Sequence, residues 1–85
     1  KELDISLARL DYTAIFDFLK TYARVSKNEA KQLLESLFYK AMVIEKLILS
    51  EKQLQNFDKA YRLLELNSRP QSIFALILMS FIKDR

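Results

Sequence analysis

Apolar residues recur at helical spacing along nearly the whole chain. No stretch alternates apolar and polar residues for long enough to predict a strand. The first main helix is predicted from about Tyr12 to Arg24, and Asp11 is placed to cap its first free N–H groups. Its apolar face combines four residues: Ile15, Phe18, Leu19 and Tyr22. Before it, Leu3, Leu7 and Leu10 share one face and predict a short helix or a turn over residues 3–10.

Two capping boxes mark where the next two helices begin. In Ser26-Lys27-Asn28-Glu29 and in Ser50-Glu51-Lys52-Gln53, the first and last side chains can accept hydrogen bonds from each other's backbone N–H groups. The first box predicts a helix to about Leu47. Its apolar stripe is Ala30, Leu33, Leu34, Leu37, Ala41, Ile44 and Ile48. The second box predicts an amphipathic helix with the stripe Leu54, Phe57, Tyr61 and Leu64. Asn67 suits its left-handed C-terminal stop.

The last predicted helix runs from Pro70 to Ile82 and is apolar on almost every side, with Ser72 and Ser80 as its small polar breaks. Thirteen helical residues span about 20 Å, which is too short to cross a hydrocarbon core of about 30 Å. A helix that is apolar on all sides must be surrounded by other elements. We therefore expect one all-α domain over residues 1–85, a small antiparallel bundle of four to five helices with this apolar C-terminal helix at its centre.

Composition excludes most kinds of chemistry. The chain has no His, Cys or Gly, so it lacks the commonest general base, the thiolate ligands of zinc and the glycine loops that hold phosphates. Glu29, Glu35 and Glu45 each lie near a Lys in sequence and are interpreted as solvated helix charges. We expect no enzyme activity, no catalytic residues, no metal and no cofactor, and no small-molecule ligand.

The net charge of +3 comes from 14 basic residues interleaved with 11 acidic ones. The basic residues do not gather on one predicted helix face, so weak nucleic-acid binding is a minor alternative. No segment is typical of a signal peptide or a membrane span. The chain begins with Lys1, in the middle of a pattern, and we expect it to be a C-terminal fragment of a longer cytoplasmic protein.

Apolar residues exceed what a small core requires. Half of the chain is hydrophobic, at 51%, although a domain of this size has a modest core. Phe38, Tyr39, Met42 and Val43 widen the apolar arc of the second predicted helix, which indicates cover on two sides. Partner binding is therefore the strongest functional class, because surplus apolar surface is typical of interaction sites.

From Ser26 onward the chain resembles the C-terminal domain of bacterial clamp-loader subunits of the DNA polymerase III holoenzyme, the delta-prime subunit first and the gamma/tau subunit next. The residues that carry the resemblance are Ser26-Lys27-Asn28-Glu29-Ala30-Lys31-Gln32-Leu33-Leu34-Glu35 and Ala60-Tyr61-Arg62-Leu63-Leu64-Glu65-Leu66-Asn67-Ser68-Arg69-Pro70-Gln71, followed by the apolar run 73–82. The chain departs from the family at Ala75, where members often carry Glu.

The resemblance implies a non-catalytic collar domain that packs beside other clamp-loader subunits in a hetero-oligomer used in DNA replication. Its partners would be those subunits, with DNA contacted only indirectly and no membrane. We expect the two flanks of the domain to use apolar residues that lie off the core stripes. These are Phe16, Phe38, Tyr39, Met42 and Met79. A helical adaptor that binds a partner helix in an apolar groove remains the alternative.

Overall fold

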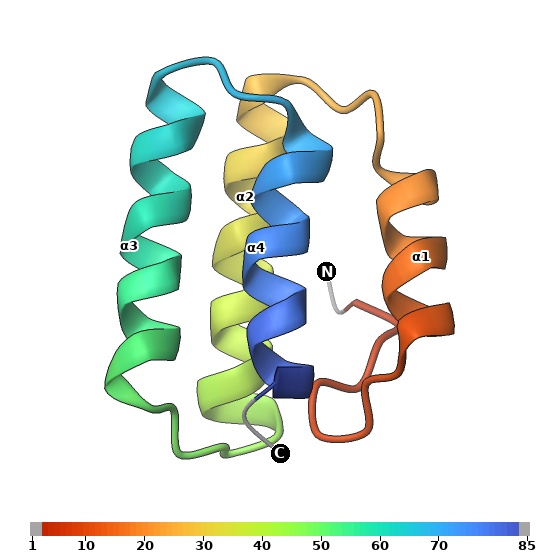
Figure 1. Ribbon diagram of the computed structural model, residues 1–85, viewed down its shortest axis with the longest axis vertical. Coiled ribbons are helices and arrows are strands. Elements are labelled where there is room, and N and C mark those ends of the chain that lie inside the picture. Colours follow the sequence, from red (N-terminus) through yellow and green to blue (C-terminus); the bar gives the residue numbers. More distant parts are fainter. Residues whose placement is uncertain (1–2, 84–85) are drawn as a thin grey trace.

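Four α-helices make up the fold in the computed structural model, which describes residues 3–83 (Figure 1). They are α1 (Tyr12–Thr21), α2 (Lys27–Tyr39), α3 (Glu51–Glu65) and α4 (Pro70–Lys83). No strand occurs within this range, so the predicted all-α fold is confirmed. The two residues at each end of the predicted domain, 1–2 and 84–85, lie outside the described residues.

The helix starts follow the capping signals in the sequence. The Asp11 side chain accepts a hydrogen bond from the Ala14 N–H at 2.8 Å. Both predicted capping boxes form: Ser26 and Glu29 bond each other's backbone N–H groups at 3.1 and 2.9 Å. The second box closes in the same way, at 3.1 and 2.8 Å. Because each box satisfies N–H groups that a helix cannot pair internally, α2 and α3 begin where local sequence predicts.

The turn from α3 to α4 is also encoded locally. Asn67 has φ 62°, a left-handed conformation that Asn adopts more readily than most residues. Its N–H bonds the Leu64 carbonyl and the Ser68 N–H bonds the Leu63 carbonyl, both at 3.0 Å. This pair of bonds is a Schellman motif. Pro70 then begins α4, where its missing N–H has no helical partner to lose.

The end of α2 differs from the prediction. The helix was expected to reach about Leu47, but its α-helical part ends at Tyr39 and continues as a π turn over Lys40–Ile44. The Glu45 N–H bonds the Lys40 carbonyl at 2.8 Å, and Lys46 leaves the helix with φ 51°. The extra residue in the turn displaces the apolar stripe. Ile44 and Ile48, both predicted on that stripe, are exposed: Ile44 within the π turn, and Ile48, at 99%, in the loop after the helix has ended.

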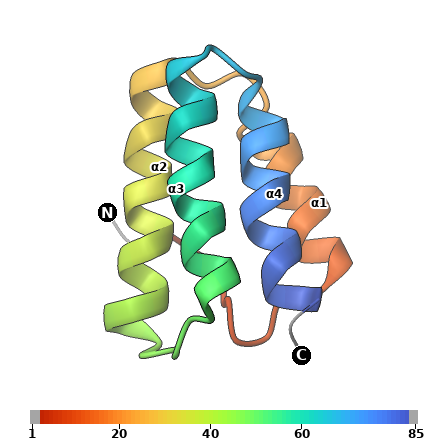
Figure 2. The same ribbon diagram turned by 60° about the vertical axis from the view of Figure 1, so that its left-hand side comes forward.

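The apolar C-terminal helix lies at the centre, as predicted. α4 contacts α1, α2 and α3, whereas among the described residues α1 packs against no helix other than α4 (Figures 1 and 2). Four of its side chains are completely buried: Ile73, Phe74, Ile77 and Leu78. The Ser80 hydroxyl donates to the Ile77 carbonyl at 2.6 Å, which removes the cost of burying it. No helix within residues 3–83 is both long enough and apolar enough to cross a bilayer.

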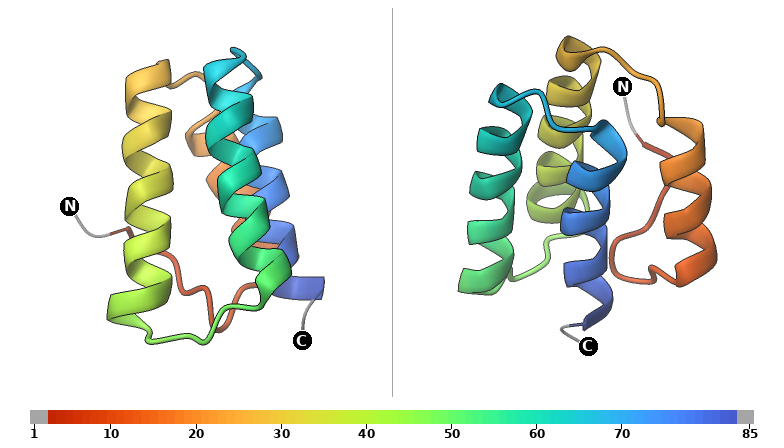
Figure 3. Two further views of the ribbon diagram at one scale, coloured as in Figure 1. Left: turned by 90° about the vertical axis from the view of Figure 1, so that its left-hand side faces the viewer. Right: turned by 45° about the horizontal axis from the view of Figure 1, so that its top comes forward.

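Residues 3–10 form a turn-containing segment without helix, which settles the two predicted alternatives in favour of the turn. We call it the N-terminal strap. It passes between α1 and α2, two helices that do not contact each other (Figure 3). Leu7 and Leu10 from the strap are buried in the main core. The strap therefore fills the space that α1 and α2 leave open beside α4.

The carboxylate of Glu45 holds the strap in place. It accepts hydrogen bonds from the N–H groups of Leu7 and Ala8, both at 2.8 Å, and from the Ser6 hydroxyl at 3.2 Å. The interpretation of Glu45 as a solvated helix charge was therefore wrong. Glu29, interpreted in the same way, is the acceptor of the first capping box. Local sequence showed no partner for Glu45, because its three donors lie 37–39 residues earlier in the chain.

We expect Glu45→Ala to lower the free energy of unfolding by about 2–3 kcal/mol, because it leaves two strap N–H groups without their charged acceptor. Chemical denaturation followed by circular dichroism measures the change. Glu65→Ala is the matched control, since its exposed ion pair with Lys27 is worth at most about 1 kcal/mol. Equal losses in the two variants would contradict the assigned role of Glu45.

Candidate interaction surfaces

The five residues predicted at a partner interface fall on two different parts of the bundle. Phe38, Tyr39 and Met42 lie together at the end of α2 and in the π turn that follows it, and all three are exposed. Phe16 lies on α1 and is 66% exposed. Met79 lies on α4, where it is half-buried and packs against the core. The structure therefore brings three of the five together and separates the other two from them.

The first surface, the α2-end surface, consists of five exposed apolar side chains close together in the chain. They are Phe38, Tyr39, Met42, Val43 and Ile44. An α-helix would direct part of this run toward the core, as the predicted stripe required. The π turn adds one residue per turn, so Met42, Val43 and Ile44 all face outward while Ala41 is the one that is buried.

The α2-end surface extends toward the start of α3. The rings of Phe38 and Phe57 are 5.1 Å apart and nearly perpendicular, which fixes the register of the two antiparallel helices. Leu54 lies one helical turn before Phe57 on α3, toward the end of the bundle that holds the α2-end surface. Leu54 was predicted on the buried stripe but is exposed, while Gln53 and Ala60 are buried in α3. Periodicity missed this because Gln53 and Leu54 precede Phe57 by four and three residues, and both spacings suit the same helix face.

The second surface, the α1/α4 groove, lies between the outer sides of α1 and α4. It has a volume of about 570 Å³ and is lined by Phe16, Leu19, Lys20, Ala23, Gln71, Ser72 and Ala75. The Gln71 side-chain amide donates to the Leu19 carbonyl at 3.4 Å and ties the two helices at one end of the groove. Ala75 lines the groove with a small side chain. Met79 follows Ala75 by one helical turn on the same side of α4.

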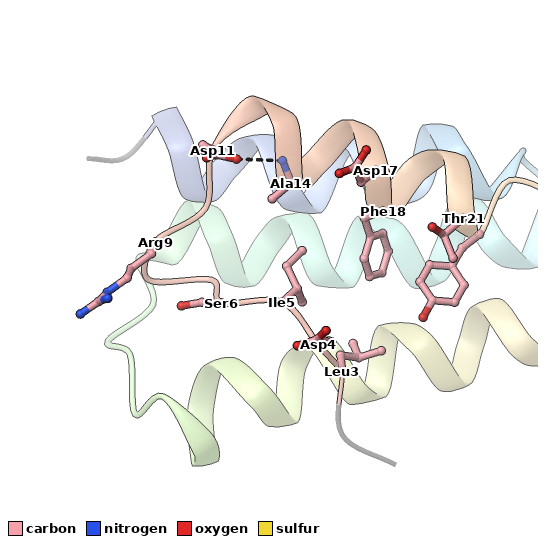
Figure 4. A pocket seen from close by; sticks show the side chains of 11 residues that line it. Leu3, Asp4, Ile5, Ser6, Arg9, Asp11, Ala14, Asp17, Phe18 and Thr21 are labelled. Atoms are coloured by element: carbon pink, nitrogen blue, oxygen red, sulfur yellow. Dashed lines mark hydrogen bonds between the residues drawn. The ribbon is translucent and has the colours of Figure 1, made fainter.

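A separate hollow, of about 450 Å³, lies between the N-terminal strap and α1 (Figure 4). The Phe18 ring points toward the strap at Leu3 and Ile5, while Arg9 points away from the bundle. Three carboxylates line this hollow, but that of Asp11 is occupied in capping α1. Within residues 3–83, no group of three or more acidic side chains is arranged to hold a metal ion. This hollow marks incomplete packing of the strap.

A partly buried tyrosine on α3, Tyr61, lies near the Glu35 carboxylate of α2. Partial burial raises the pKa of the Tyr61 hydroxyl above its ordinary value, and the nearby Glu35 carboxylate raises it further. Both effects disfavour the phenolate, because burial removes its hydration and Glu35 adds a like charge. The position is structural: Tyr61 packs against the core and lies outside both apolar surfaces.

Tyr61 should make folding less stable at high pH. Because its pKa is higher in the folded chain, the unfolded chain loses the proton first, and stability falls as the pH rises above about 10. Tyr61→Phe removes this ionisation, so its stability should fall less between pH 9 and pH 11 than that of the original chain. Denaturation curves of the two proteins at several pH values in this range measure the difference. An equal loss of stability in the two proteins between pH 9 and pH 11 would contradict the prediction.

Comparison with protein-family models, with curated proteins and with solved structures found no match to this chain. Any function of the two surfaces must therefore follow from the residues that they present.

Proposed function

We propose that this chain is a non-catalytic assembly module that contacts neighbouring proteins through the α2-end surface and the α1/α4 groove. The observation that carries the proposal is the exposure of five apolar side chains within seven consecutive residues, Phe38 to Ile44, beside a well-formed core. Isolated exposed apolar residues are normal, but a contiguous patch is typical of interaction sites. The second surface gives the module a further contact on α1 and α4, so that it can lie between two neighbours.

A comparison of the free energy gained by burial with the free-energy cost of association favours an assembly that uses both surfaces. Each side chain of the α2-end surface already has about half of its area covered, so complete burial contributes roughly 1 kcal/mol per residue. Association costs about 4–15 kcal/mol in lost freedom of movement. The α2-end surface alone therefore supports a weak complex. A ring in which each subunit contacts two others joins the contributions of both surfaces, since the second contact forms at high effective concentration.

The specific setting that we propose is the collar of a bacterial clamp loader, in the cytoplasm, with other loader subunits as partners. Support comes from the resemblance at Ser26–Glu35 and Ala60–Gln71. These segments form the capped start of α2 and the end of α3 with its Schellman motif and the start of α4. The module would hold subunits together for sliding-clamp loading in DNA replication and would take no part in ATP hydrolysis.

A helical adaptor is the second candidate, and the α1/α4 groove favours it. A groove between two helices with one large exposed aromatic, Phe16, suits an amphipathic partner helix. In this case the groove alone would carry binding, and the α2-end surface would contribute little.

Two variants test the assembly proposal. We expect Phe16→Ser and the double variant Tyr39→Ser with Met42→Ser each to weaken binding to purified gamma and delta subunits of a bacterial clamp loader by about tenfold or more. Tyr39 and Met42 are chosen over Phe38, because the Phe38 ring contacts the buried Phe57. Sedimentation velocity measures the assembly, and circular dichroism checks that each variant folds.

Leu66→Ser provides the control. Leu66 is 76% exposed at the end of α3 and lines neither surface, so its variant should assemble normally. Unchanged assembly in both test variants would contradict the proposal, and absence of binding by the original chain would contradict the clamp-loader setting. Loss of a partner through Phe16→Ser alone, with the double variant unaffected, would identify the adaptor.

A further inference from the structure

The loops 22–26 and 66–69 lie at the same end of the bundle, the upper end in Figures 1 and 3. Two side-chain contacts join the elements there. Gln71 at the start of α4 bonds the Leu19 carbonyl in the last turn of α1, and Lys27 at the start of α2 pairs with Glu65 at the end of α3, at 3.6 Å. We call this region the loop end. The α2-end surface lies at the other end of the molecule.

Basic residues concentrate at the loop end. Segments 20–31 and 62–72 contain six basic residues and two acidic ones, a net charge of +4, whereas the whole chain carries +3. All six are exposed: Lys20, Arg24, Lys27, Lys31, Arg62 and Arg69. The sequence interpretation compared the basic residues one helix face at a time. It missed their convergence, because the two segments are about forty residues apart and meet only in the folded bundle.

The two acidic residues at the loop end are already engaged. The Glu29 carboxylate accepts from the Ser26 N–H at 2.9 Å, and Glu65 pairs with Lys27. Arg62 pairs with Asp58 at 3.6 Å. Within the described part of the chain, the remaining four cations form no ion pair: Lys20, Arg24, Lys31 and Arg69. The helix dipoles cancel at this end, since two helices start and two finish there, so the positive field comes from these side chains.

We propose that the loop end binds the phosphate backbone of nucleic acid without reading its sequence. Besides the four cations it exposes Asn28, Asn67, Gln71 and Ser72, and side chains of these types donate hydrogen bonds to phosphate oxygens. Leu66 is the single large apolar side chain exposed within segments 20–31 and 62–72. An amphipathic membrane-surface site typically adds several such side chains that insert between the lipids. The loop end therefore fits a hydrated polyanion.

The dimensions agree with a small number of phosphate contacts. The bundle measures 25 × 24 Å across its axis. A face of this width spans about seven phosphates along one strand of a duplex. Four cations contacting phosphates release about four counterions, which predicts a slope of roughly −3.6 for log K against log salt concentration on duplex DNA. Affinity should therefore fall about 150-fold between 50 and 200 mM NaCl.

The test is fluorescence anisotropy of a labelled 20-base-pair duplex titrated with the full chain at several salt concentrations. We expect a Kd on the order of 10⁻⁵ M in 50 mM NaCl. Arg24→Gln with Arg69→Gln should reduce the slope by about 2 units and weaken binding at 50 mM NaCl. Lys46→Gln with Lys52→Gln is the matched control, because it removes the same charge from the opposite end of the bundle. It should leave the salt-dependence slope and the phosphate contacts unchanged.

Four results would overturn the proposal. The first is absence of DNA binding at a protein concentration of about 10⁻⁴ M in 50 mM NaCl. The second is an equal effect of the two double variants, which would show that binding follows net charge alone. The third is displacement of the duplex by a polyglutamate peptide at equal charge, which would indicate an acidic protein partner. The fourth is stronger binding to phosphatidylserine vesicles than to the duplex, which would indicate a membrane. None of these outcomes depends on the clamp-loader subunits.

Discussion

The burial of α4 is the constraint on which the rest of the bundle depends. No charged residue occurs between Pro70 and Ile82, and each fully buried side chain of this helix contributes about 2 kcal/mol to stability relative to exposure. Three helices and the strap supply the cover, and rings from α1 and α3 pack edge-on against Phe74 and Phe81. The outer side of α4, with Ala75 and Met79, stays half-covered. The same apolar helix therefore supplies the centre of the core and one wall of an interaction groove.

The N-terminal strap fills the gap that α1 and α2 leave beside α4, and Glu45 connects the strap to the α2-end surface. Because α1 and α2 do not touch, the core beside α4 would be open without Leu7 and Leu10. The strap has no helical hydrogen bonds of its own, so Glu45 supplies an acceptor for its N–H groups. Glu45 directly follows the π turn that exposes Met42, Val43 and Ile44. The hydrogen bonds that close the core thus also fix the position of the α2-end surface.

The two ends of the molecule differ in character. The α2-end surface is apolar, whereas the loop end carries a net charge of +4 and mainly polar neighbours. An apolar patch associates by excluding water, and a cluster of cations attracts polyanions over a distance of about 10 Å at moderate salt. Hydrophobic association and attraction of polyanions therefore act on different faces. Added salt weakens the attraction of polyanions but does not weaken hydrophobic association. The α2-end surface can therefore contact a protein neighbour without covering the loop end. A neighbour in the α1/α4 groove would reach Lys20, Gln71 and Ser72, which belong to both the groove and the loop end.

The sequence by itself determined the helix starts, the left-handed turn at Asn67 and the central position of α4. These depend on neighbouring residues: a capping box closes over four positions, and a helix without a polar side must be buried wherever it lies. The exposure of Phe16 was also predictable, because it lies off a clear stripe. Only the tertiary structure decided the end of α2, the role of Glu45, the exposure of Leu54 and the convergence of the basic residues. Each of these depends on partners in distant parts of the chain, and helical periodicity carries no information about which distant segments meet.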